Sequence, residues 1–435
     1  MSGLSVDHPA LSRIDEPWTM VVSGVGADER VDITLEVEDG ARRRWSSSAS
    51  FSARADGTVD LTRQAPLAGG SYEGVDPMGL LWSMLPVEGS AFFTRTRPLP
   101  LVYTCRVRTA AGEVSETTFE RCFRHRAVEH PVEDGVVVGT LHLPEGEQSS
   151  PGVLLLGGSD GQPLDAAAAL LADHGFAVLA ARWFGAEGRP AQLTHVELDE
   201  LDAHVDWLLR HPSVCGDSIR VVGFSRGAEL ALELASGNAD VSTVVAGAPS
   251  SVRQAGITSD HRFTEPAWQR HGEALPFLRG ASQFTFMWAW LGSLLRRRGL
   301  RQDALFSRML RRTDQVERAT IPVEQCRGPI IVITGDDDGL WPSTTYAQRI
   351  AARLASKGRS DTFQHRQMLG AGHFCSYPYA LVSLPPMTEL RANAAFRLDF
   401  GGSARDNARA ARDSWRVVLA ALEGPPHHDE QEEEE

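Results

Sequence analysis

The stretch Ile219–Ala235, which reads IRVVGFSRGAELALELA, decides the fold of this chain. It opens with a largely β-branched apolar run and ends in a series of strong helix formers. Between them lies the G-x-S-x-G motif Gly223-Phe224-Ser225-Arg226-Gly227. Small residues two positions on either side of the serine let strand and helix approach closely and leave the serine on a sharp turn. The stretch therefore predicts Ser225 as a nucleophile in an α/β-hydrolase fold.

The surrounding sequence, residues 129–424, alternates short apolar runs with helical stretches. This alternation predicts a mostly parallel, doubly wound sheet covered by helices on both faces. Residues 249–320 interrupt the alternation, so we expect them to form an insertion that covers the catalytic site as a lid. The expected strands are at 136–143, 153–156, 177–181, 219–222, 243–246, 329–334 and 362–368.

Residues 14–128 have a different pattern, in which short alternating runs are separated by glycine and aspartate turn signals. Several short strands without a long helical period predict a β-sandwich domain. The residues before it, 1–13, are expected to be an N-terminal extension. The expected strands are at 18–22, 31–37, 50–54, 101–107 and 117–123.

Composition limits the classes of function. The chain has 435 residues, of which 42% are hydrophobic and 23% charged, as in globular proteins with a sizeable core. Its net charge is −14, and the glutamate-rich end at 425–435 predicts a disordered acidic tail. Because a general basic footprint is missing, we expect no nucleic-acid partner.

The five cysteines are odd in number and scattered, which argues against a disulfide scaffold or a structural zinc site. A bridge between Cys105 and Cys122 would require their strands to pair. The N-terminus has no apolar core of signal-peptide length, and the run 284–295 is too short to span a membrane. We therefore expect a cytoplasmic protein without a membrane span; the sequence does not indicate its oligomeric state.

A second segment, Gly157-Gly158-Ser159-Asp160-Gly161, also matches G-x-S-x-G. There the following residues include Pro163, which delays the helix, whereas the helix after Ser225 begins at once. We therefore assign Ser225 as the nucleophile and the earlier segment as an oxyanion-hole loop. The predicted oxyanion donors are the backbone N–H groups of Arg226, Gly158 and Ser159.

The triad acid and base of this fold follow the nucleophile in the order Ser, Asp or Glu, His. Asp336-Asp337-Asp338 come directly after the strand at 329–334, and Asp338 has the usual offset from the glycine before them, with Asp337 as the alternative. Three adjacent aspartates could instead bind a divalent cation or form a polar, helix-capping loop. Among fourteen histidines, His373 is favoured as the base because it follows the last expected strand in a Gly-Ala-Gly-His loop. His365 and His174 fit structural positions.

The chain resembles the family of type I acyl-CoA thioesterases and bile acid-CoA:amino acid N-acyltransferases along nearly its whole length. The most specific similar segment is GSYEGVDPMGLLWSM at 70–84. The other similar segments and residues are 15–17 (DEP), Trp45, 56–61 (DGTVDL), 174–178 (HGFAV), 223–230 (GFSRGAEL), 321–324 (IPVE), 337–343 (DDGLWPS), 372–373 (GH), 401–402 (GG), Ala408, Ala410, Asp413 and Trp415.

The resemblance implies an immunoglobulin-like N-terminal domain and hydrolysis of an acyl-CoA thioester through an acyl-enzyme, without a cofactor, since CoA is part of the substrate. Members carry serine or cysteine at the nucleophile position, and Ser225 favours hydrolysis over transfer to an amino acid. The alternatives are an acyltransferase, a carboxylesterase acting on oxygen esters, and a degenerate binding module. The chain departs from the family pattern in the loop 157–161, which has fewer glycines, and in the poorly matched segment 251–320.

Two features of the insertion concern the substrate. Phe284–Leu291 could line an acyl channel or pack the lid. Arg296-Arg297-Arg298 and Arg301 could meet CoA phosphates or form a solvated helix face.

Overall fold

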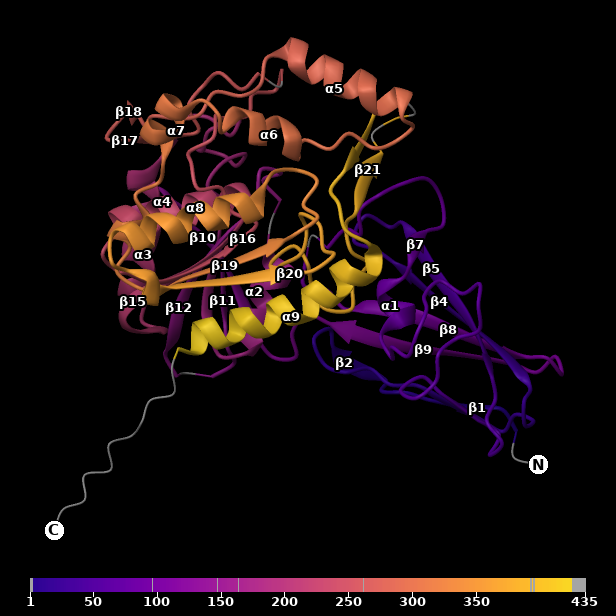
Figure 1. Ribbon diagram of the computed structural model, residues 1–435. Helices are drawn as coiled ribbons and strands as arrows, with labels where there is room; N and C mark the ends of the chain where they lie inside the picture. Colours follow the sequence, from indigo (N-terminus) through magenta and orange to yellow (C-terminus); the bar gives the residue numbers. More distant parts are fainter. Residues whose placement is uncertain are drawn as a thin grey trace.

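The computed structural model describes residues 3–95, 97–146, 148–162, 164–260, 262–391, 393 and 396–424 (Figure 1). The acidic tail expected at 425–435 lies outside these residues. In the described ranges, no helix combines the length and the apolar character that crossing a membrane requires.

The N-terminal region consists of two sheets. Along their longer strands buried and exposed residues alternate, as the period-2 pattern predicted, and their buried side chains belong to one hydrophobic cluster. The smaller sheet has the order β1 (Ser5–Asp7), β3 (Val21–Ser23), β6 (Thr58–Asp60). The larger has the order β2 (Leu11–Arg13), β9 (Val114–Cys122), β8 (Leu101–Thr109), β4 (Arg30–Glu38), β5 (Arg44–Ser52), β7 (Leu85–Pro86), with the short α1 (Gly79–Trp82) beside it.

Two details differ from a simple reading of the sequence. The described part of the segment 1–13 is no mere extension, because β1 pairs with β3 and β2 pairs in parallel with β9. Strands β8 and β9 do pair, but Cys105 lies opposite Thr117, so its thiol does not face Cys122, and both thiols are free.

The second region is built on an eight-stranded sheet. Its first two pairings are antiparallel and the rest, from β13 to β20, are parallel. Every strand expected from the sequence between 136 and 368 is present. The order is β10 (Val128–Asp134), β11 (Val137–Leu143), β13 (Ala177–Ala181), β12 (Ser150–Leu156), β15 (Val214–Phe224), β16 (Val241–Gly247), β19 (Ile330–Gly335), β20 (Phe363–Met368).

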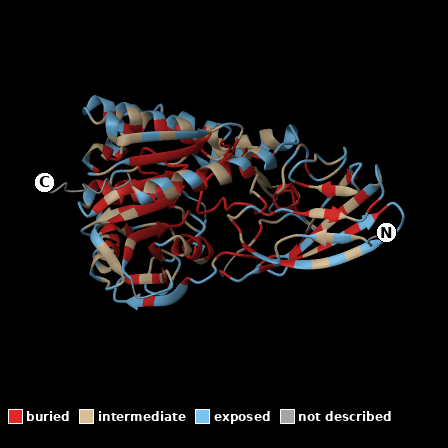
Figure 2. Cartoon of the chain, turned by 90° about the horizontal axis from the view of Figure 1, so that it is seen from below, coloured by how far each residue is buried: buried red, intermediate tan, exposed pale blue. Residues whose placement is uncertain are grey.

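Helices cover both faces of this sheet, and successive residues of each strand point alternately to one face and the other. Val153 and Leu155 pack with α2 (Asp165–Asp173) and α9 (Ala404–Glu423). Leu154 and Leu156 pack on the other side with α3 (Leu198–Arg210), α4 (Arg226–Gly237) and α8 (Ser343–Ser356). Figure 2 shows the result as strands that are buried along most of their length. The predicted α/β-hydrolase fold, preceded by a β-rich region, is confirmed; the narrower immunoglobulin-like assignment stays a prediction.

The segment between β16 and β19 lies above the carboxyl ends of the parallel strands (Figure 1). It is the stretch expected as an insertion, and β17 also pairs with β14 (Val196–Glu197). The short strands β21 (Glu389–Arg391) and β22 (Arg397–Asp399) lie beside this segment. Elsewhere, the 3-10 turn η2 (Ser360–Thr362) directly precedes β20. The segment contains β17 (Trp268–Arg270), β18 (Glu273–Ala274), α5 (Gln283–Leu295), α6 (Asp303–Met309), α7 (Thr313–Ala319) and the turn η1 (Val323–Gln325).

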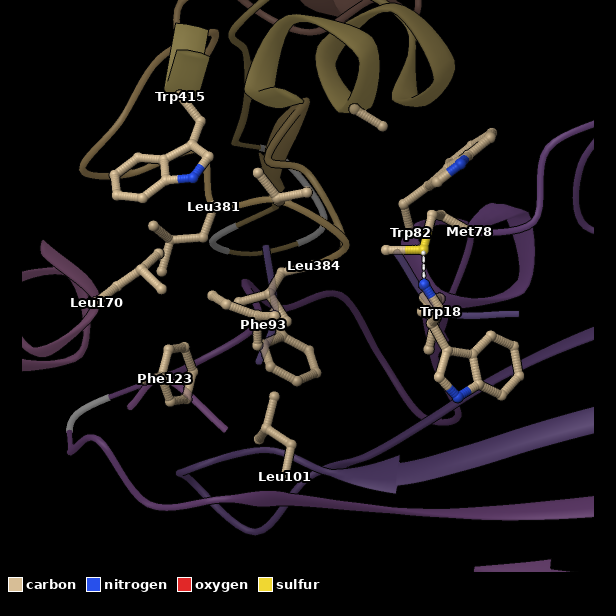
Figure 3. Packing of buried hydrophobic residues seen from close by; sticks show 14 of the residues in the cluster. Trp18, Met78, Trp82, Phe93, Leu101, Phe123, Leu170, Leu381, Leu384 and Trp415 are labelled. Atoms are coloured by element: carbon tan, nitrogen blue, oxygen red, sulfur yellow. Dashed lines mark hydrogen bonds between the residues drawn. The ribbon is translucent and has the colours of Figure 1, made fainter. Parts of the chain in front are cut away.

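The two regions share one continuous core. Figure 3 shows Phe123 of the N-terminal region near Leu170 of the second region, and Phe93 near Leu384. Trp415 of the second region belongs to the same cluster. Nearby, the backbone N–H of Trp18 donates to the sulfur of Met78 at 3.3 Å (Figure 3). Burial of large apolar side chains from both sides fixes the N-terminal region against the sheet region.

Candidate active site

Ser225 lies at the turn between β15 and α4, as its motif predicted. Its backbone has φ 54° and ψ −115°, a conformation that residues other than glycine rarely adopt. A Cβ atom on Gly223 would lie 2.2 Å from the carbonyl oxygen of Gly227, and one on Gly227 would lie 2.2 Å from that of Gly157. The two glycines of the motif are therefore required by close backbone approach, and they allow the strained turn that exposes the serine to the cavity above it.

Ser225, His373 and Asp338 form one hydrogen-bonded chain. Nε2 of His373 lies 3.1 Å from Oγ of Ser225, and Nδ1 of His373 lies 2.9 Å from Oδ2 of Asp338. All three side chains are buried. Trp341 and Phe224 contact the imidazole edge-on, with ring centroids 5.8 and 5.2 Å away, which holds the ring in its plane. The arrangement suits proton transfer from serine to histidine, with the carboxylate fixing the tautomer.

The three adjacent aspartates have three separate roles. Only Asp338 reaches the histidine; its second oxygen accepts from the N–H groups of Leu340 and Trp341. Asp337 pairs with Arg301 at 2.9 Å, and Asp336 accepts from the N–H of Gly370. The divergence of these carboxylates agrees with the finding that no cluster of metal-ligating side chains exists within the described ranges.

The other two histidines considered from the sequence have structural partners. Nε2 of His365 bonds Oγ1 of Thr334 at 2.8 Å, within the sheet. Nε2 of His174 bonds the carboxylate of Asp15 at 2.7 Å, at the boundary with the N-terminal region.

The three expected oxyanion donors differ in their surroundings. The N–H of Arg226 belongs to the first turn of α4, where the helix itself offers no acceptor. Ser159 lines the cavity next to Ser225. The N–H of Gly158, in contrast, donates to the phenol oxygen of Tyr379 at 2.9 Å, so this N–H already has an acceptor. The oxyanion donors stay a prediction, and the N–H of Gly158 is the one of the three that is bonded to Tyr379.

Tyr379 was missed by sequence reasoning. Its hydroxyl donates to Asp160 in the same loop as Gly158, and its backbone carbonyl accepts from Arg95 of the N-terminal region. Burial raises the pKa of the Asp160 carboxyl and lowers the pKa of Arg95 to about 10. No motif marks these residues, because Arg95 and Tyr379 are 284 positions apart and belong to irregular segments.

A buried ion pair between Arg226 and Glu229 lies directly after Ser225. The side chain of Arg226 pairs with Glu229 at 2.9 Å and stacks on Trp268 with a centroid distance of 5.2 Å. Glu229 also accepts from the indole N–H of Trp268 at 2.6 Å and from the N–H of Gln254 at 2.9 Å. Burial raises the pKa of Glu229 to about 7. These contacts fix the side chain of Arg226, and with it the backbone that bears one candidate oxyanion donor.

A cavity of about 490 Å³ opens beside Ser225 and is lined mainly by apolar side chains from the segment between β16 and β19. The stretch expected to line an acyl channel, Phe284–Leu291, contributes only Phe286. Arg301, considered as a phosphate ligand, is engaged by Asp337. The large apolar lining residues are Ile257, Phe263, Phe286, Leu305, Phe306, Met309, Leu340, Trp341, Phe396 and Leu398.

Family models match both regions of the chain. The model described as the acyl-CoA thioester hydrolase/BAAT N-terminal region covers residues 15–132. The model described as the BAAT / acyl-CoA thioester hydrolase C terminal covers residues 196–423, just over half of the chain.

Individual relatives match over almost the full length. The peroxisomal succinyl-coenzyme A thioesterase of Mus musculus is 29% identical over 96% of this chain and 95% of its own. Acyl-coenzyme A thioesterase 6 of Mus musculus is 30% identical over 95% and 94%. The bile acid-CoA:amino acid N-acyltransferase of Mus musculus is 27% identical over 95% and 96%.

Similarity to solved structures is weaker. A dienelactone hydrolase-like promiscuous phosphotriesterase, P91, from metagenomic libraries aligns with a TM-score of 0.41 and 16% identity, over 69% of this chain and 98% of that one. The family models and the full-length relatives decide the assignment: this chain belongs to the BAAT / acyl-CoA thioester hydrolase family.

Proposed function

We propose that this protein hydrolyses acyl-CoA thioesters, with Ser225 as nucleophile, His373 as general base and Asp338 as the carboxylate that orients the histidine. The observation that carries the proposal is the continuous chain of hydrogen bonds from Ser225 through His373 to Asp338. Membership of a family whose relatives include acyl-CoA thioesterases supports the choice of a thioester substrate.

In the first step Nε2 of His373 accepts the proton of Ser225 as the serine oxygen attacks the thioester carbonyl. The carbonyl oxygen becomes an oxyanion, which the N–H groups of Arg226 and Ser159 stabilise, each by about 3 kcal/mol. The tetrahedral intermediate then expels CoA, which receives a proton from His373, and leaves an acyl-enzyme on Ser225.

In the second step water replaces CoA. His373 takes a proton from the water as its oxygen attacks the acyl ester, and returns that proton to Oγ of Ser225 as the free acid leaves. Asp338 stabilises the imidazolium that forms in each step. The mainly apolar lining of the cavity supports an acyl chain as the group held beside Ser225 during both steps.

Hydrolysis is favoured over transfer to an amino acid because position 225 is serine, although one full-length relative is an N-acyltransferase. Assays with and without glycine or taurine distinguish the two, since transfer yields an amide and hydrolysis yields the free acid. Comparing acyl-CoAs with p-nitrophenyl esters tests a preference for oxygen esters. The cytoplasmic location stays a prediction, because relatives include peroxisomal and mitochondrial proteins.

The decisive experiment measures CoA thiol release from acyl-CoAs of increasing chain length. Ser225→Ala is expected to lower kcat by at least about 10³-fold, as loss of a triad nucleophile does. Ser159→Ala is the matched control: it alters the other G-x-S-x-G serine but keeps its backbone N–H, so activity should stay within about tenfold. Activity that survives Ser225→Ala, or a protein active only on oxygen esters, would refute the proposal.

A further inference from the structure

Helix α5 presents a stripe of large apolar side chains to solvent. Relative to Phe284, the residues Met287, Trp288, Leu291 and Leu295 are at positions i+3, i+4, i+7 and i+11, which places all five on one helix face. Phe284, Trp288 and Leu295 are 64%, 56% and 79% exposed, and no residue of α5 is buried. Single exposed apolar residues are ordinary, but a contiguous stripe of this kind marks an interaction site.

The opposite face of α5 accounts for its attachment to the protein. Phe286 on that side lines the cavity, and Ala289 and Trp290 are half-buried. Figure 1 shows α5 as the outermost helix of the segment between β16 and β19, with α6 and the sheet beneath it. Packing against the cavity therefore explains the apolar residues of the inner face and leaves those of the outer face without an intramolecular role.

A basic triplet follows the stripe. Arg296, Arg297 and Arg298 come directly after α5 and are all exposed. Arg296 contacts the carbonyl of Gly292 in its own helix at 3.5 Å, and no ion pair between described residues joins the triplet to a carboxylate. Because the chain as a whole carries a net charge of −14, this triplet is a local positive site on an acidic protein.

The length and composition of α5 indicate how it could meet a lipid. At 1.5 Å per residue its thirteen residues extend about 20 Å, too short for a bilayer core of about 30 Å. α5 itself carries no charged side chain, and the arginines begin directly after its last residue. Aromatic rings are favoured at the headgroup level of a membrane, and neighbouring basic residues add attraction to anionic lipids. The charge of the triplet selects anionic headgroups, since guanidinium groups bind phosphate well.

We propose that α5 and Arg296–Arg298 dock on an anionic phospholipid surface, with Phe284, Trp288 and Leu295 inserted among the headgroups. Phe286, on the other side of the same helix, lines the cavity that contains Ser225. Docking therefore places the cavity beside the membrane, where amphiphilic acyl substrates concentrate. Only this last consequence rests on the proposed function; the docking itself does not.

The charge arm of the test measures co-sedimentation with phosphatidylcholine vesicles that either contain or lack phosphatidylglycerol. The wild type should bind the anionic vesicles, and less well at higher salt. R296E/R297E/R298E should weaken binding by at least roughly a hundredfold, because each arginine lost costs about fivefold and each glutamate added is repelled by the anionic lipid. The matched control is R42E/R43E/R44E, another exposed arginine triplet with the same charge change, which likewise contains one residue at positive φ; it should bind as the wild type does.

The apolar arm uses W288A/L295A, which should weaken binding without altering the net charge. Its control is L85A/V102A, two apolar residues of the N-terminal sheet that are similarly exposed and lie away from the lid. Both arms measure binding, so loss of hydrolysis on Ser225→Ala does not affect them.

Failure of the wild type to bind anionic vesicles, or equal weakening by both arginine triplets, would overturn the proposal. Sedimentation velocity without lipid examines the other occupant of the stripe, a second copy of the chain. Suppose that the wild type is a dimer that does not bind vesicles, and that W288A/L295A is a monomer. This result would assign α5 to self-association and reject lipid docking.

Discussion

The N–H of Gly158 donates a hydrogen bond to the phenol oxygen of Tyr379 at 2.9 Å. Because the same hydroxyl donates to Asp160, Tyr379 holds both ends of the loop that includes Ser159. The relationship ties the loop after His373 to the loop after β12, and so connects two of the segments that surround Ser225.

Tyr379→Phe tests whether this contact positions the oxyanion loop. The change removes the acceptor of Gly158 and the donor of Asp160, so we expect a roughly tenfold lower kcat, a nearly unchanged KM and a loss of about 1–3 kcal/mol in stability. Steady-state kinetics and thermal unfolding measure the two effects. An unchanged or higher kcat would mean that the freed N–H of Gly158 is itself an oxyanion donor.

Arg95→Met tests the contribution of the N-terminal region. Arg95 donates to the carbonyl of Tyr379, and neighbouring Phe92 contacts Phe374, next to His373, with ring centroids 6.2 Å apart. Loss of the guanidinium should therefore lower kcat several-fold while the protein stays folded. Arg97→Met, an exposed arginine of the same segment, is the control and should leave kcat unchanged. Equal effects of both variants would contradict a positioning role for Arg95.

The parts of the fold and site that could be predicted are those that local sequence encodes. Apolar runs such as 153–156 are buried on both faces of the sheet, so periodicity and composition reveal them as strands. The separation of Ser225, Asp338 and His373 along the chain is large, but each follows a strand whose carboxyl end lies at the same edge of the sheet. Chain order and strand position were therefore enough to predict that these three side chains lie together.

The remaining features depend on contacts that leave no local pattern. Strands β1 and β2 are three residues each, and they are strands only because β3 and β9 lie beside them. Tyr379 and Arg95 act through backbone and hydroxyl groups of irregular segments. In α5, apolar residues lie on both faces, so hydrophobicity alone did not separate Phe286, which lines the cavity, from Trp288, which faces solvent.

Leu305→Trp tests whether the cavity holds the acyl chain. Leu305 lies on α6, lines the cavity and is nearly buried, so an indole there occupies space that a long chain requires. We expect kcat/KM for long acyl-CoAs to fall at least tenfold while values for short ones change little. Leu369→Trp, at an exposed leucine outside the lid, is the control. A uniform loss across chain lengths would place the acyl chain elsewhere.

The buried carboxyl of Glu229 predicts a specific pH dependence of stability. Burial raises its pKa from 4.5 to about 7 in the folded protein, so between these values the folded state binds a proton that the unfolded state has lost. This group's contribution to the free energy of unfolding is therefore full below about pH 4.5 and is lost as the pH rises to about 7. Denaturant titrations of Glu229→Gln should therefore show no such decrease in the free energy of unfolding between about pH 4.5 and 7. Glu36→Gln, at an exposed carboxylate of β4, is the control and should show the same decrease as the wild type. Identical pH profiles for the wild type and Glu229→Gln would show that Glu229 remains ionised throughout, held by Arg226.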